Sequence, residues 1–252
     1  MRDDSEFLAK RLKELAERAE RTGIFTFSPF LGMAEQDVFY RTVKPTVHAK
    51  ATAFGGVEGC ERVMLRFGDS EELGYEEPFP IVCLLLEPAA PKFAESLTHR
   101  DYLGALMHLG MEREMLGDIV VRDKVAYLFA HERMANMIIE DLTRVRHTEL
   151  RVKVAPALPE GALYRTEERL LQASGERLDG VIAKLYHISR SDALALFHRE
   201  LVFVDGRACT SPAREVAEGA CVSVRGYGRF IYRGFRSETK KGKLNLVVDM
   251  YV

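Results

Sequence analysis

Residues 187–206 read HISRSDALALFHRELVFVDG, and this stretch decides the fold predicted for the last third of the chain. Ser189 is a good helix N-cap, with Asp192 three residues later where a capping-box acid stands. The stretch LVFVDGR then predicts a strand, a two-residue Asp-Gly turn of type I′ and a second strand. The helix between cap and strand is expected to bury Ala193, Leu194 and Phe197.

A second helix is predicted just before this stretch, where RLDGVIAKLYHI begins at Arg177. Its apolar residues recur at helical spacing and form one stripe: Leu178, Val181, Ile182 and Leu185. Arg177 and Lys184 are seven residues apart, so they lie together along one edge of that stripe. Two short helices and a β-hairpin therefore form the expected unit.

The Ser-Arg-Ser sequence at 189–191 falls at a helix start. Free backbone N–H groups and the positive end of the helix dipole favour an anion there. Arg190 adds a guanidinium that can bind phosphate with two hydrogen bonds. Ser191, His198 and Arg199 share the outer face of the same helix.

Charge is divided unevenly along the chain. The 252 residues carry a formal net charge of -2, but residues 165–252 sum to +4 and the remainder to -6. A basic end on an acidic body indicates a polyanionic partner. Cations crowd the segment 225–243, with Tyr227, Phe230, Tyr232 and Phe235 interleaved, which predicts phosphate contacts beside stacked bases. The segment 237–243 is expected to be the tip of a hairpin.

This pattern over 177–230 resembles the RNA-binding domain of ribosomal small-subunit protein four, the S-four domain. The matching residues are RLD at 177–179, SRS at 189–191, VFVDGR at 202–207, Pro212 and VSVRG at 222–226. Two positions depart from the pattern: Glu200 stands where a Gly is usual, and Gly219-Ala220 replaces a Gly-Asp turn. Glu200 adds negative charge close to the expected RNA face.

Nearly the whole chain resembles the bacterial YlmH family of S-four proteins. The stretches that carry this resemblance are GGVEGCERVMLRFG (55–68), LGMEREMLGDIVV (109–121) and SVRGYGRF (223–230). The resemblance implies binding to ribosomal RNA and tRNA on the large ribosomal subunit, a role in rescuing stalled translation and a link with cell division. The expected RNA contacts are Arg177, Lys184, Ser189, Arg190, Ser191, His198, Arg199, Arg207, Arg225, Arg229, Lys240, Lys241 and Lys243.

Earlier in the chain, strand and helix patterns alternate as β-α-β-β-α-β over residues 80–156, the order of ferredoxin-like domains. An amphipathic helix opens the chain, with Phe7, Leu8, Leu12, Leu15 and Ala19 on one face and Gly23 after it. A strand pair around Gly55-Gly56 follows. The fold class is therefore α+β, in three parts: an N-terminal helix-plus-strands region at 1–73, a ferredoxin-like domain at 74–157 that is expected to bind RNA, and an S-four-type domain with a basic hairpin extension at 169–252. Residues 157–168 are predicted to be a linker.

Few features of the sequence indicate catalysis. GGVEG (55–59) lacks the Lys-Ser/Thr of a phosphate loop and favours a turn, and the seven His form no metal-ligand spacing. Four separated cysteines and no signal or membrane-spanning run favour a cytoplasmic protein with reduced thiols. We expect no cofactor, metal, small-molecule substrate or membrane partner. An RNA-modifying enzyme of pseudouridine-synthase or methyltransferase type, and a protein-docking module, remain as alternatives.

Overall fold

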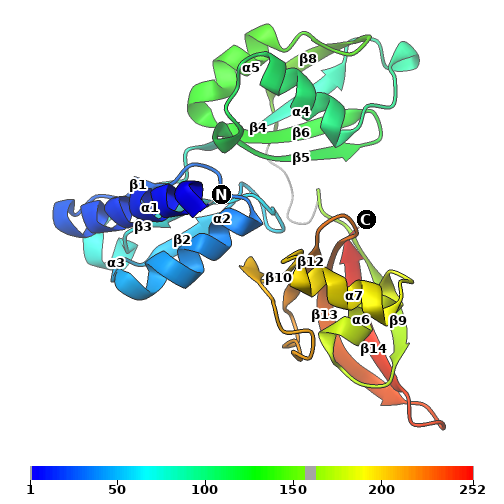
Figure 1. Ribbon diagram of the computed structural model, residues 1–252. Coiled ribbons are helices and arrows are strands. Elements are labelled where there is room, and N and C mark those ends of the chain that lie inside the picture. The colour runs from blue at the N-terminus through cyan, green and yellow to red at the C-terminus, as the bar shows by residue number, and fades with distance from the viewer. Residues whose placement is uncertain (1, 157–162, 252) are drawn as a thin grey trace. The chain divides into compact units, whose positions relative to one another are not determined.

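The charged N-terminal stretch forms one long helix, α1 (Arg2–Thr22), in the computed structural model, which describes residues 2–156 and 163–251 (Figure 1). Leu12, Ala16 and Ala19 are its buried stripe, and Gly23 ends it at φ +64°, as predicted. Phe7 was expected on this stripe but is 69% exposed. It lies five residues before Leu12, so it points about 140° away from the buried side of the helix.

The segment after α1 builds a small antiparallel sheet with the order β1-β3-β2. The predicted pairing of β2 (Ala51–Phe54) with β3 (Met64–Phe67) is confirmed, and β1 is Thr26–Phe27. A Cβ on Gly56, which has φ +111°, would lie 2.3 Å from the Phe129 ring, so glycine permits close packing on the neighbouring sheet. The short helices here are α2 (Met33–Val38), η1 (Phe39–Val43), η2 (Lys44–Thr46) and α3 (Ser70–Leu73).

The central segment follows the predicted element order, with one additional two-residue strand between α5 and the last strand. An antiparallel sheet has the order β5-β6-β4-β8-β7, with α4 and α5 packed on one face (Figure 1). Thr98 caps α4 and forms a capping box with Asp101. The bounds are β4 (Ile81–Pro88), η3 (Pro91–Phe93), α4 (His99–His108), η4 (Arg113–Met115), β5 (Leu116–Arg122), β6 (Val125–His131), η5 (Glu132–Met134), α5 (Ala135–Asp141), β7 (Arg144–Val145) and β8 (Thr148–Val154).

The chain divides into two compact units, Met1–Leu163 and Tyr164–Val252. Helices and antiparallel sheets occur in both, which confirms the α+β class. The finer division at residues 73 and 157 stays a prediction. Cys60, Cys83, Cys209 and Cys221 are all free thiols.

In the second unit, a helix pair covers one face of a six-stranded antiparallel sheet with the order β11-β10-β12-β13-β14-β9. Asp205 and Gly206 both have positive φ, as the predicted Asp-Gly turn requires. The bounds are β9 (Thr166–Ala173), α6 (Leu178–Leu185), α7 (Arg190–His198), β10 (Val202–Val204), β11 (Arg207–Ala208), β12 (Cys221–Val224), β13 (Gly228–Glu238) and β14 (Leu244–Tyr251).

Strand β9 corrects the predicted linker. Residues 166–168, assigned to a connection, begin a strand that pairs along its whole length with β14. Most side chains of β9 are exposed, so the strand shows no alternation that would reveal it in the sequence. Residues 157–162 of the predicted linker, and Val252, lie outside the described residues.

Candidate nucleic-acid interface

The helix pair places the Ser-Arg-Ser sequence at the start of α7, as predicted. Ser189 is the N-cap, and its Oγ accepts from the Asp192 backbone N–H at 3.0 Å. The Ser189 hydroxyl also lies 2.6 Å from the Asp192 carboxylate and 2.7 Å from the Ser191 Oγ. Both serines are exposed, but their hydroxyls already hold the helix start.

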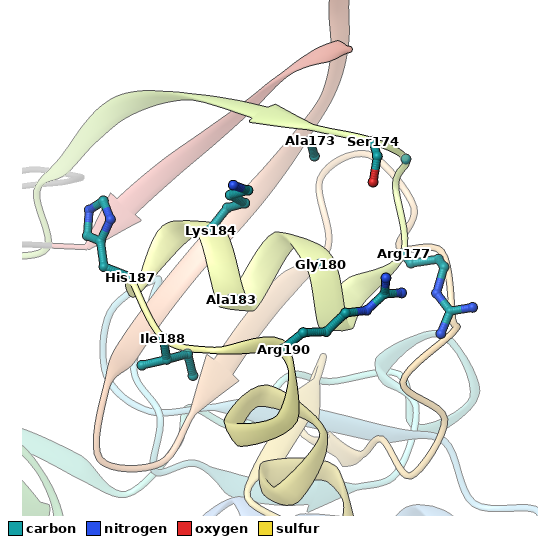
Figure 2. A pocket seen from close by; sticks show the side chains of 10 residues that line it. Ala173, Ser174, Arg177, Gly180, Ala183, Lys184, His187, Ile188 and Arg190 are labelled. Carbon is teal, nitrogen blue, oxygen red and sulfur yellow. The ribbon is translucent and has the colours of Figure 1, made fainter. Parts of the chain in front are cut away.

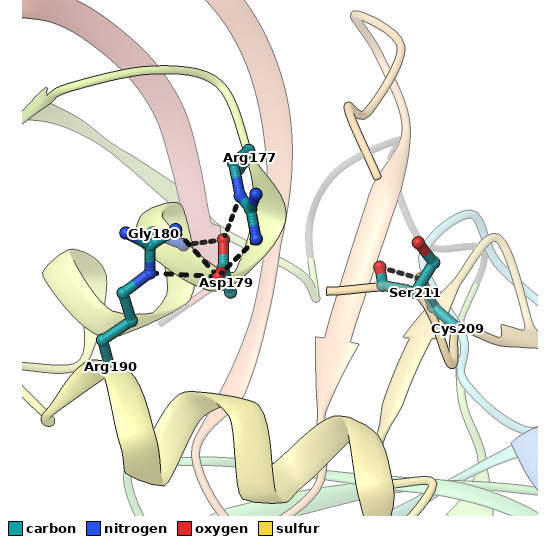
Figure 3. Close-up of polar contacts among 6 residues, drawn as sticks. All are labelled: Arg177, Asp179, Gly180, Arg190, Cys209 and Ser211. Atoms are coloured by element: carbon teal, nitrogen blue, oxygen red, sulfur yellow. Dashed lines mark hydrogen bonds and ion pairs between the residues drawn. The ribbon is translucent and has the colours of Figure 1, made fainter. Parts of the chain in front are cut away.

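A buried carboxylate joins the two arginines expected to bind phosphate. Asp179, near the start of α6, is only 1% exposed. Arg177 donates to it through Nε and Nη2, both at 3.1 Å, and Arg190 through Nε at 3.1 Å (Figure 3). The Gly180 backbone N–H donates a further bond at 2.9 Å. Half of each arginine side chain stays exposed, so Asp179 fixes the guanidiniums without removing them from solvent.

Electrostatics favours the ionised form of this carboxyl. Burial opposes ionisation of Asp179, but the hydrogen bonds from Arg177 and Arg190 outweigh it, so the pKa of Asp179 is lowered. The same hydrogen bond raises the pKa of Arg177. The cluster therefore carries two cations and one anion, a net charge of +1.

These arginines border a groove of about 620 Å³ beside α6 (Figure 2). Arg177, Arg190, Lys184 and His187 supply its polar side chains together with Ser174. Small residues make up much of the rest: Ala173, Gly175, Gly180 and Ala183. Among the described lining residues none is acidic, so the groove offers cations around a floor that large groups can approach closely. Arg177, the N-cap of α6, and Lys184 both line this groove.

Other predicted contacts lie outside this groove. His198 and Arg199, at the end of α7, are exposed, as are Arg207 and Arg225. The Arg225 guanidinium lies 5.2 Å from the centre of the Phe203 ring. Lys240, Lys241 and Lys243 are exposed at the tip of the β13–β14 hairpin, which projects beyond the rest of the unit (Figure 1). We call this hairpin the arm. Its predicted place at 237–243 is confirmed.

Burial changes the interpretation of the basic run. Arg229 is 9% exposed, and its guanidinium lies 4.5 Å from the Tyr164 ring centre and 3.9 Å from that of Tyr251. Phe230 and Tyr232 are core residues, so the expectation that they stack on bases is wrong. Alternation along β13 directs these two rings into the core, while Tyr227 and Phe235 remain exposed.

Two further cations of the run are paired with acids. Arg233 Nε lies 2.6 Å from Asp249, and Arg236 forms a two-bonded pair with Glu168 at 2.8 and 3.0 Å. Both pairs lie along the arm, where they reduce its net positive charge. The open cations of the arm are therefore concentrated at its tip.

Glu200 has a conformation that explains the usual glycine. Its φ is +53°, in the left-handed region, directly after α7. The Glu200 N–H donates to Phe197 O at 3.0 Å, and the Leu201 N–H to Leu196 O at 2.9 Å, which closes the helix end. Glycine adopts this conformation without strain, whereas a glutamate does not.

Sequence reasoning missed the role of Asp179. The residue was quoted in RLD at 177–179, but only as part of a matching pattern. An acid two residues after an arginine, at an apolar helix start, is the signal that could have identified it. Within residues 2–156 and 163–251, no cluster of His, Cys, Asp or Glu is suited to hold a metal ion.

Comparison with known proteins supplies the class. The family model described as "Putative RNA-binding domain in YlmH" matches residues 76–158. "Ribosome-associated protein quality control protein P2" of Bacillus subtilis (strain 168) is 32% identical over 161 residues, or 64% of this chain and 62% of that protein. The match therefore spans less than two thirds of that relative. "Cell division protein ylmH from Streptococcus pneumoniae" has a TM-score of 0.48 at 18% identity, covering 61% of this chain and 92% of that one.

The class indicated in this way for residues 76–158 is that of the RNA-binding domain described for YlmH. Over this domain and the matched part of the B. subtilis relative, the chain is similar to proteins of the YlmH family. In the part of the chain that the structure describes, no helix is both long and apolar enough to cross a membrane.

Proposed function

We propose that this protein is a non-catalytic RNA-binding protein that acts on the ribosome. The observation that carries the proposal is the groove beside α6, where buried Asp179 holds two half-exposed arginines over a floor of small residues. Fixed guanidiniums bind phosphate with less loss of side-chain entropy than mobile ones. The absence of acidic side chains among the described lining residues keeps the groove attractive to a polyanion.

The proposed partners are ribosomal RNA and tRNA on the large subunit, and the proposed role is the rescue or quality control of stalled translation in the cytoplasm. The name of the B. subtilis relative supports the ribosomal role. The family resemblance adds the link with cell division. A ferredoxin-like RNA-binding domain and an S-four domain with its arm would then be two RNA-contacting parts of one chain.

Phosphate contacts are assigned to the side chains rather than to the start of α7. Asp192 and the serine hydroxyls already occupy that helix start, and the Asp192 carboxylate would repel an anion there. Arg177 and Arg190 therefore make the principal contacts in the proposal, and Lys184 extends the line along α6. The tip of the arm supplies a second contact. Such binding is shape-led and weakens steeply with salt.

Sedimentation through sucrose tests the ribosomal role. The wild-type chain is expected to move with large subunits, and Arg177→Ala plus Arg190→Ala is expected to stay at the top of the gradient. A matched control is Arg169→Ala plus Arg233→Ala, which removes two exposed arginines that are ion-paired outside the groove. If the Arg177→Ala plus Arg190→Ala variant still sediments with large subunits, the groove is not the RNA-binding site. A modified nucleoside formed from RNA and S-adenosylmethionine would instead identify an enzyme.

A further inference from the structure

Three connections meet at one end of the central sheet, in the first compact unit. In the β4–β6 pairing, Leu86 faces Ala126, and in the β4–β8 pairing, Pro88 faces Leu150. The end of β4 therefore lies beside the β5–β6 turn and the β7–β8 turn. Nothing in the proposal for the groove uses this end of the sheet.

Among the residues that the structure describes, Phe93 is the most exposed large apolar side chain, at 82%. A single exposed apolar side chain is ordinary on a protein surface. What distinguishes Phe93 is the rigidity of the turn that presents it. Pro91 begins this one-turn helix, and the Phe93 N–H donates to Ala90 O at 3.0 Å.

Both neighbouring turns clamp this segment. The Lys124 ammonium, from the β5–β6 turn, donates to Pro91 O at 3.0 Å and Ala94 O at 2.9 Å. On the other side, the Glu95 carboxylate accepts from the His147 N–H at 3.1 Å, and the Glu95 N–H donates to Thr148 Oγ1 at 3.1 Å. The backbone on both sides of Phe93 is thus fixed, while its ring remains in solvent.

One cation lies close to this ring, and two more lie in or beside the neighbouring β7–β8 turn. The Lys92 ammonium lies 6.0 Å from the Phe93 ring centre. Arg144 and Arg146, in and beside the β7–β8 turn, are ion-paired with Glu149 and Asp101, yet each arginine side chain is 62% exposed. Proteins hold unpaired bases with a fixed, exposed aromatic ring that stacks on the base and with nearby cations that contact phosphates. Phe93, with Lys92 beside it, and the arginines of the neighbouring turn offer these groups.

We propose that Phe93 is a stacking platform for one unpaired RNA base, with Lys92, Arg144 and Arg146 placed to contact the flanking phosphates. This inference rests on the proposed function, because it requires the 76–158 domain to meet RNA. Single-stranded RNA is favoured over a protein partner because one ring among charged residues offers a base a flat face but offers no apolar patch of the size that protein docking uses. The platform and the groove would then bind different forms of RNA.

Two RNA probes separate the platform from the groove in the full-length chain. The first is a short single-stranded RNA with one 2-aminopurine, whose fluorescence is quenched when the base stacks. The second is a labelled RNA stem-loop, bound mainly through its helix and followed by anisotropy. The variants are Phe93→Ala, Phe93→Tyr, the groove pair Arg177→Ala plus Arg190→Ala, and Phe7→Ala as a control at another exposed phenylalanine.

Wild type, Phe93→Tyr and Phe7→Ala are expected to quench the probe. Phe93→Ala is expected to lose the quench and to bind the single strand roughly tenfold more weakly, the size of one base–aromatic stack. The groove pair should lose the stem-loop but keep the quench. Because Phe93 is exposed, circular dichroism should show the same fold in the alanine variant.

A Phe93→Ala chain that quenches and binds like wild type would overturn the platform. So would normal single-strand binding by that variant together with its release from ribosomes, which would assign the ring to a protein contact. If wild type quenches the probe but does not bind the stem-loop or sediment with ribosomes, the groove proposal fails and the platform stands.

Discussion

Asp179 is almost fully buried, yet both of its carboxylate oxygens accept hydrogen bonds from arginines that reach solvent. Its lowered pKa means that the folded unit holds the proton less tightly than the unfolded chain does. The stability from this carboxylate is therefore present above the unfolded pKa of about 3.9 and is lost as pH falls through the lower folded value.

Asp179→Asn tests this carboxylate, because the amide keeps one accepting oxygen while its nitrogen only donates and so cannot accept from an arginine. We expect the second unit to lose about 2 kcal/mol of unfolding free energy at pH 7, the scale of hydrogen bonds to a charged group. The loss should shrink toward pH 3, and RNA affinity should fall because the guanidiniums are released. Urea unfolding at the two pH values measures the first effect. An equal loss at both would contradict the linkage to ionisation.

Glu200 combines a strained backbone with an unfavourable charge, and two variants separate these effects. Glu200→Gly removes both, and we expect about 1 kcal/mol of added stability from relief of the left-handed conformation. Glu200→Ala removes the charge alone. Both should tighten RNA binding, but only the glycine variant should raise the melting temperature. Equal melting temperatures for the two variants would show that the backbone at residue 200 is not strained.

At the scale of the element, the arm divides its cations between an ion-paired stem and an open tip. Lys240→Gln plus Lys241→Gln should lower the slope of log affinity against log salt by roughly 0.7 to 0.9 for each lysine that meets a phosphate. Arg233→Gln plus Arg236→Gln makes the same change in net charge within the stem. A smaller change in slope is expected there, since those cations already have carboxylate partners. Equal slopes for the two pairs would rule out a specific role for the tip.

The whole molecule shows where sequence patterns are sufficient. Helix α4 and strands β4, β5, β6 and β8 follow the predicted order, because caps, turns and apolar runs there agree with the final packing, whereas the two-residue strand β7 has no such signal. Strand β9 was not predicted because its residues form a strand through pairing with β14, 71 or more residues away in the sequence, and not through their own pattern. The predicted buried stripe wrongly included Phe7, because a spacing of five residues, from Phe7 to Leu12, does not return to the same face of a helix.

The groove could be predicted only in part. Spacing alone aligned Arg177 with Lys184 along α6, and the Ser189 cap followed from residue type. The bond from Arg190 to Asp179 joins two helices, so it depends on how they pack and not on either helix alone. For the same reason, nothing in SVRGYGRF indicated that Arg229 would be enclosed by two tyrosines from distant parts of the chain.

Arg229→Ala should therefore be a stability variant rather than a binding variant. Loss of its contacts with Tyr164 and Tyr251 should cost the second unit about 2 kcal/mol, the upper range for desolvated cation–π contacts. Hydrogen exchange should show faster opening in β9, β13 and β14, with no change within residues 2–156. RNA affinity of the folded protein should stay at the wild-type value. A selective loss of affinity without destabilisation would return Arg229 to the RNA interface.

The packing of Arg229 against Tyr164 and Tyr251 also bears on how this unit can be combined with other domains. Tyr164 is the first residue of the second unit and Tyr251 is close to its last residue in the sequence, yet their ring centres are 6.1 Å apart. The polypeptide thus enters and leaves the unit at neighbouring points, the geometry that allows a domain to be inserted into a surface loop of another protein. We expect that residues 164–251 can be inserted into a surface loop of another protein without distorting that loop.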